Sequence, residues 1–136
     1  WGATYGEKGY TSFAVDEYLT AIRLMPVRDE FLAMIYDNLA DCYEKDDLYD
    51  IAIEAYRQAY QILEGGSQQT YPLRGIARIC LLQNKKDSAL LYYQKALDYA
   101  LVEQDSSLIG ALYHDLAMVY NEKKIMFKPI NMYRKQ

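Results

Sequence analysis

Proline and glycine are scarce in this sequence, with 3 and 7 residues among 136. That is too few for a turn-rich β-sandwich or for a collagen-like chain. Long apolar runs are also absent, and none approaches the roughly 18 residues that a membrane span needs. Acidic residues outnumber basic ones, 19 against 15, so the surplus of Lys and Arg that general affinity for nucleic acid requires is missing. What remains is the composition of a soluble globular domain.

The residue types that usually carry chemistry are few. Cys42 and Cys80 do not make a disulfide framework, and we predict that both are buried free thiols, which favours a cytoplasmic location. His114 is the only histidine, and no ligand-spaced Cys or His lies beside it. The glycine pair at 65–66 lacks the following Lys-Ser/Thr of a phosphate-binding loop. We therefore expect no metal site, no cofactor and no enzymatic activity.

Tyrosine is in excess, with 15 residues against 3 Phe and 1 Trp. Many of these tyrosines recur at fixed spacings. From Tyr43, an alanine follows after nine residues, a tyrosine after four more and an alanine after three more. Four stretches share this register at offsets of 38, 37 and 40 residues, beginning with the runs 1–5, 39–43, 76–80 and 116–120. Repetition at this period is typical of proteins built from stacked structural repeats.

The pattern resembles the tetratricopeptide repeat (TPR) family over essentially the whole chain. The second unit matches well, with Tyr36, Leu39, Ala40, Tyr43, Ala52, Tyr56 and Ala59 in the family's order. The resemblance implies an all-α fold, a right-handed α-solenoid of stacked antiparallel helix hairpins (a TPR-like superhelix). We predict a single TPR domain over 1–136, with units at about 1–28 (first helix truncated), 29–66, 67–105 and 106–136 (second helix truncated).

The helix signals agree with these units. Asp46 and Asp47 precede the second helix of unit two, and Asp87 precedes that of unit three, so we predict that they are N-caps. Pro129 lies in the first turn of the last helix if that helix begins near Phe127, and kinks it otherwise. We expect a stub before residue 8 and helices at about 10–25, 29–44, 48–64, 71–83, 87–103, 107–122 and 127–135.

The excess of tyrosine has a structural interpretation. Nine of the 15 tyrosines occupy the large-residue positions of the repeat: Tyr5, Tyr18, Tyr36, Tyr43, Tyr56, Tyr93, Tyr113, Tyr120 and Tyr133. We predict that these side chains fill the space beside the helix crossings, where small residues let the two backbones approach. Tyr71 is not one of them, and it opens a helix on the expected binding face.

In the TPR family the first helices of successive units line a concave groove that holds the partner. The resemblance implies groove positions at Asp37, Asn38, Asp41, Glu44, Tyr71, Arg74, Arg78, His114 and Asn121. Asp37/Asp41 and Arg74/Arg78 are each four residues apart, so each pair shares one helix face. Two interpretations stay open: the arginines bind a carboxylate of a peptide, or the aspartates and arginines neutralise each other. Some TPR proteins clamp the carboxylate of a chaperone tail, but unit two has acids where that ligand needs basic groups.

The resemblance implies a non-catalytic protein- or peptide-binding module of a larger, regulatory or signalling protein. The alternative is a structural assembly module that self-associates through its repeat ends. Both ends fall within expected helices without a polar capping segment, which predicts a fragment of a longer protein, or ends that are covered by self-association. Residues 1–68 have a net charge of -8 and residues 69–136 of +4, which favours head-to-tail contacts. An RNA-binding repeat is disfavoured because the first half is acidic, so we expect a protein or peptide partner, no nucleic acid and no membrane span.

Overall fold

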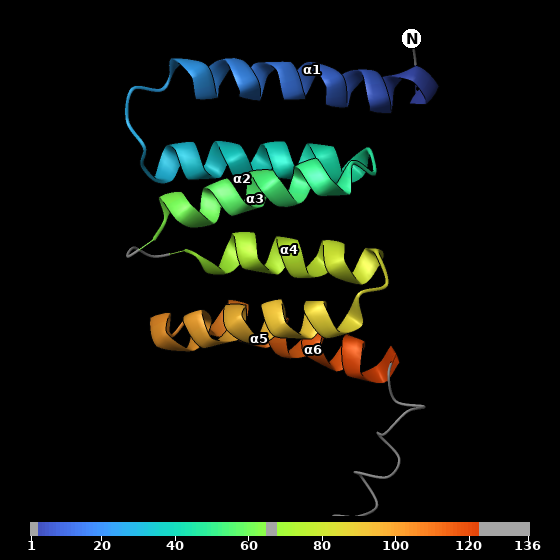
Figure 1. Cartoon of the computed structure of the whole chain (residues 1–136), viewed down its shortest axis with the longest axis vertical. Helices are drawn as coiled ribbons and strands as arrows, with labels where there is room; N and C mark the ends of the chain where they lie inside the picture. The colour runs from blue at the N-terminus through green and yellow to red at the C-terminus, as the bar shows by residue number, and fades with distance from the viewer. Residues whose placement is uncertain (1–2, 65–67, 123–136) are drawn as a thin grey trace, which may run out of the picture.

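The computed structural model describes residues 3–64 and 68–122, and the side chains from residue 11 onward within those ranges. These residues form six helices and no strand. Figure 1 shows successive helices running in opposite directions and stacked along one axis, from α1 at one end to α5 and α6 at the other. The all-α helical-repeat solenoid is confirmed. The helices are α1 (Ala3–Leu24), α2 (Glu30–Lys45), α3 (Tyr49–Ile62), α4 (Thr70–Leu82), α5 (Lys86–Glu103) and α6 (Ser106–Glu122).

The helix boundaries follow the sequence except at the beginning of the chain. Helices α2 to α6 begin and end within about two residues of the expected positions. The expected break near residue 8 is wrong, because α1 continues without interruption. Gly6 and Gly9 weaken a helix by only about 1 kcal/mol each, and no proline interrupts the segment. The helix expected at 127–135, with Pro129, lies outside the described residues, and the unit boundaries stay predictions.

The links between paired helices correct the predicted N-caps. Asp46 is the C-terminal cap of α2, and Asp47 has a left-handed backbone with φ of 62°. Asn84 has the same φ at the end of α4, one repeat period later. Asp and Asn tolerate this conformation better than most residues, and it lets the next backbone N–H bond back to the helix end. Asp87 lies inside the first turn of α5, so it is not the N-cap either.

Small buried residues let the paired helices lie close together. Ala40 on α2 and Ala52 on α3 have no exposed surface, and the same holds for Ala77 on α4 and Ala89 on α5. Side chains of this size let two helix backbones approach closely. The space beside these crossings is filled by larger buried groups in one continuous core from α2 to α6. Of the two free cysteines, Cys80 is buried and the other is half-buried, and burial raises the pKa of both thiols.

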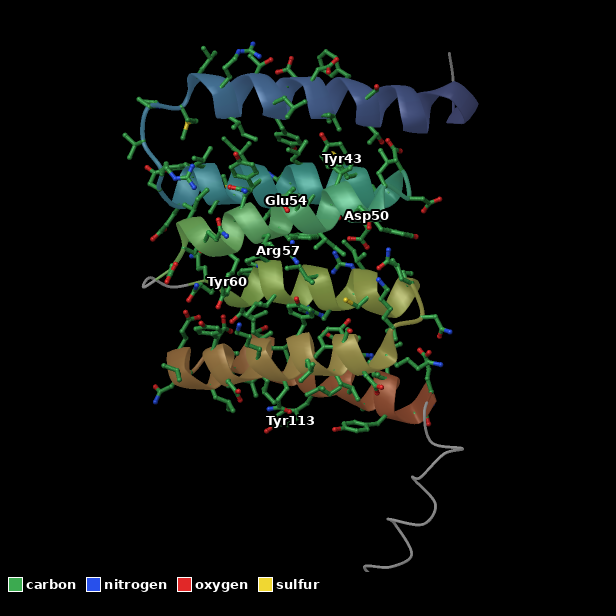
Figure 2. The ribbon with its side chains drawn as sticks, viewed as in Figure 1. Tyr43, Asp50, Glu54, Arg57, Tyr60 and Tyr113 are labelled. Carbon is green, nitrogen blue, oxygen red and sulfur yellow. The ribbon has the colours of Figure 1, made fainter. Side chains whose placement is uncertain are left out.

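The repeat tyrosines divide according to their place in the stack. Tyr56 and Tyr93 are each only 4% exposed, while Tyr18, Tyr36 and Tyr43 are partly buried against the core. Figure 2 shows Tyr43 on the side of α2 that faces α1, and Tyr113 at the far end of the stack. The prediction of core packing is wrong for Tyr113 and Tyr120, which are 56% and 43% exposed. The side chains of Tyr5 and Tyr133 lie outside the described residues.

Candidate functional site

A groove of about 550 Å³ lies between α2 and α4, the first helices of units two and three. We call it the α2–α4 groove. Its volume falls within the range of protein ligand pockets. Residues from α3 and the link before α4 complete its lining, which consists of Glu30, Phe31, Ala33, Met34, Asp37, Asn38, Tyr56, Leu63, Gln68, Tyr71, Arg74, Gly75 and Arg78.

The absence of a side chain at Gly75 lets α4 lie close to α3. A Cβ atom at this position would lie within 3.0 Å of three ring carbons of Tyr56. Tyr56 is buried, and its ring belongs to the continuous core. Any side chain at this position would therefore displace the ring, and with it one wall of the groove.

Arg78 is held in place by a network that joins three helices. Its Nε and Nη2 atoms donate to the two carboxylate oxygens of Glu44 on α2, both at 2.8 Å. Nη2 also donates to the Tyr56 hydroxyl at 3.0 Å. This two-pronged geometry is the strong form of an Arg–carboxylate contact. The hydrogen bond to Glu44 raises the pKa of Arg78, and burial raises the pKa of Tyr56, so both groups keep their protons.

Arg74 is neutralised by an acid on a different helix, α6. Its Nε atom donates to Oδ2 of Asp115 on α6 at 2.6 Å. Asp41 lies 3.3 Å from the ammonium group of Lys45 on its own helix. Acids do neutralise both groove arginines, but among the described contacts these acids are Glu44 and Asp115. They are not the aspartates that share one face of α2.

Asp37 is an acidic residue of the groove that forms no ion pair within the described part of the chain. Its Oδ1 atom is buried and accepts no hydrogen bond within the described part of the chain. Burial raises the pKa of its carboxyl to about 7. A buried oxygen without a hydrogen bond is destabilising, and the same carboxylate belongs to a residue that lines the groove.

The structure brings five of the nine predicted site residues together. Asp37, Asn38, Tyr71, Arg74 and Arg78 all line the α2–α4 groove. The other predicted positions lie outside that lining. Glu44 supports the groove through its arginine, Asp41 does not reach it, and His114 and Asn121 line a separate site of about 450 Å³ on α6.

Sequence reasoning missed the apolar rim of the groove. Phe31 and Met34 on α2 line it and are 66% and 50% exposed, and Tyr71 on α4 is 52% exposed. The helical period contained the signal, because residues three and four positions apart share a face. Stepping back along α2 from Asp37 and Asn38 leads to both apolar residues. Glu30, at the first turn of α2, was missed in the same way.

A tetratricopeptide repeat family model matches residues 31–101, which is just over half of the chain. The match covers α2 to α4 and nearly all of α5, and thus the groove. This chain belongs to the tetratricopeptide repeat family. Repeats of this family are generally protein-interaction modules, and the family is typically non-catalytic.

Two further likenesses cover most of this TPR chain. It is 27% identical over 124 residues to "Uncharacterized protein ycf37" of Cyanophora paradoxa, covering 88% of this chain and 67% of that protein. The crystal structure of BtubC (BKLC) from P. vanneervenii superposes with a TM-score of 0.67 and 20% identity. The superposition covers 91% of this chain and 52% of that one, so this chain spans about half the length of the solved structure. At this identity the likeness shows the fold.

The described residues hold neither a metal-binding cluster nor a membrane-spanning helix. No group of three or more His, Cys, Asp or Glu side chains there could hold a metal ion. None of the described helices combines the length and apolar character that crossing a bilayer requires.

Proposed function

We propose that this TPR domain is a non-catalytic protein- or peptide-binding module of a larger, regulatory or signalling protein, and that its partner binds in the α2–α4 groove. The observation that carries the proposal is the combination of a groove of about 550 Å³ with three large apolar side chains exposed at its edge. Exposed apolar groups gathered at one hollow are typical of interaction sites. The regulatory role rests on the resemblance to long-period TPR units.

A selection experiment tests this proposal. Peptides of about a dozen residues from a random display library are selected on the 136-residue chain, and their affinities are measured by fluorescence anisotropy. We expect Met34→Ala and Tyr71→Ala to weaken binding by about tenfold each, because both remove apolar contact area from the groove. Leu91→Ala and Val102→Ala on α5 are matched controls, since these side chains are 72% and 82% exposed but lie outside the groove lining.

The four variants distinguish binding in the groove from binding elsewhere on the chain. Loss of affinity in the two groove variants with unchanged affinity in the two α5 variants supports binding in the groove. Failure to select any peptide would overturn the proposal, and so would equal effects in the four variants. Far-ultraviolet circular dichroism checks that each variant keeps its helices.

The structural assembly module is the second candidate. The observation that favours it is exposed apolar surface on the first and last of the described helices: Phe13 on α1 is 62% exposed, and Tyr113 on α6 is 56% exposed. Head-to-tail contact of these ends would extend the stack. Light scattering over a range of concentrations tests this candidate. A rising mass that Phe13→Asp abolishes supports assembly, whereas a constant monomer mass contradicts it.

A further inference from the structure

Among the described residues, the basic residues that line the α2–α4 groove form ion pairs, whereas the acidic residues that line it do not. Of its four charged lining residues, Arg74 and Arg78 are neutralised by acids that lie outside the lining. The other two, Glu30 and Asp37, make no ion pair within the described part of the chain. The charged groups of the groove that are left without an ion pair there are therefore both acidic, although equal numbers of acidic and basic residues line it.

Asp37 lies among groups that would suit a cationic side chain. It follows Met34 by one turn of α2, and its Oδ1 atom has no donor. Phe31, Met34 and Tyr71 form an exposed apolar rim of the same groove. The side chains of Lys and Arg have apolar stems that cover such surface while the charged head reaches a carboxylate. An aromatic rim adds attraction for a cation through its ring faces.

An acidic ligand fits this groove less well. The charge of Arg78 is already balanced by Glu44, which accepts two hydrogen bonds of 2.8 Å from it, so a ligand carboxylate would share the guanidinium with that acid. The charge of Arg74 is likewise balanced by Asp115. The ligand carboxylate would also approach the unpaired carboxylate of Asp37, and like charges repel most strongly where water is excluded.

We infer that the α2–α4 groove recognises a lysine or arginine side chain of its protein partner through Asp37, with an adjacent apolar residue against Phe31, Met34 and Tyr71. This inference rests on the proposed function and specifies its ligand. The cation pairs with the carboxylate of Asp37, which forms no ion pair within the described part of the chain, and the apolar neighbour covers the rim. Specificity then comes from Asp37, because a partner that places an acidic side chain beside it leaves the charge of Asp37 unpaired.

The peptides selected on the wild-type chain provide the test. Their sequences should be enriched in Lys or Arg next to a large apolar residue. Asp37→Asn removes the charge but keeps the shape, and it should weaken these peptides by about tenfold or more. Asp41→Asn is the matched control, because Asp41 lies one turn further along α2 and contacts Lys45 outside the groove. It should change affinity by less than about twofold.

A double-mutant cycle ties the peptide's charge to Asp37. Replacing the basic residue of a selected peptide with norleucine should weaken binding to the wild type but have little further effect on Asp37→Asn. Binders without a basic residue, or with equal affinity for both proteins, would overturn the inference while leaving groove binding intact. Failure to obtain binders would instead count against the proposed function itself. Acidic binders that lose affinity in Arg74→Ala or Arg78→Ala would show that the groove reads the opposite charge.

Discussion

The centre and the ends of this stack are built from the same repeat but differ in how they use it. In the centre, Tyr56 and Tyr93 occupy the aromatic position of the second helices and are buried between neighbouring helices. At the far end, Tyr113 and Tyr120 occupy repeat positions of α6 and remain exposed. The described helix that packs against α6 is α5, whereas α4 contacts helices on both sides. Burial of a repeat position is therefore set by its neighbours in the stack, as expected for repeats that stabilise one another.

The largest contrast should appear when a tyrosine is truncated. Tyr56→Ala removes a buried ring from the continuous core, and we expect a loss of about 3–5 kcal/mol in the free energy of unfolding. Tyr93→Ala should behave in the same way. Tyr113→Ala removes an exposed side chain and should lose less than about 1 kcal/mol. Urea unfolding followed by circular dichroism measures all three. Equal losses at the centre and the end would show that the central tyrosines are no more important for stability than Tyr113.

The pH dependence of stability tests the unpaired carboxylate in the centre. Burial raises the pKa of Asp37 from 3.8 to about 7, so between these values the folded state holds a proton that the unfolded state releases. Its contribution is fully present below about pH 4 and is lost as the pH rises through about 7. Relative to Asp37→Asn, the wild type should lose roughly 4 kcal/mol of stability between about pH 4 and pH 8.

The control for this experiment is Asp41→Asn, which leaves the groove carboxylate in place. Its stability should follow the wild type across the whole pH range. Asparagine at position 37 carries no titrating group, so that variant should show the flatter profile. A difference between wild type and Asp37→Asn that does not change with pH would mean that Asp37 is well solvated or paired.

Two glycines offer a matched pair of substitutions. Gly75→Ala, in the centre, places a methyl group against the ring of Tyr56 and should destabilise the fold by about 1–3 kcal/mol. Gly110→Ala, on α6, meets open space, with nothing within 4 Å of the added atom. It should stabilise the protein by about 0.5–1 kcal/mol through better helix propensity. Thermal unfolding compares the two, and a stabilising effect at position 75 would show that α4 does not lie so close to α3.

The smallest contrast concerns ion pairs. Arg78→Ala breaks a contact between helices and leaves Glu44, whose side chain is only 13% exposed, without its partner. We expect a loss of about 1–2 kcal/mol, much of it from the unpaired acid. Lys45→Ala breaks an exposed pair within α2 and should lose no more than about 0.5 kcal/mol. Urea titrations of both variants in low and high salt measure the two losses in the free energy of unfolding. A larger loss for Lys45→Ala than for Arg78→Ala would contradict the expected order.

The repeat spacing and the resemblance to the TPR family were together enough to predict the fold and five of the residues that line the groove. Positions such as Ala40 and Ala77 are identifiable because a close helix crossing excludes larger side chains. Arg74 and Arg78 could be placed on one helix face because residues four positions apart lie on the same side of a helix. These predictions depend on local geometry, which the order of residues in the chain determines.

The rest depends on contacts between units, which spacing alone does not determine. Asp41 and Glu44 lie about one helical turn apart on α2. Which of them Arg78 contacts therefore depends on how far α2 and α4 are shifted along their axes. Asp47 could cap a helix or adopt a left-handed turn, and the hydrogen bonds of the α2–α3 link decide for the turn. The exposure of Tyr113 depends on what packs against α6, not on its place in the repeat.

Binding in the α2–α4 groove can be located by recording the chemical shifts of the backbone amides with and without a peptide selected on the wild-type chain. The account predicts changes centred on residues 30–38 of α2 and 71–78 of α4, around Asp37. The same peptide should leave the shifts of Asp37→Asn nearly unchanged at equal concentration. Changes confined to α1 and α6, with none in the α2–α4 groove, would contradict the account and favour contact through the ends of the stack.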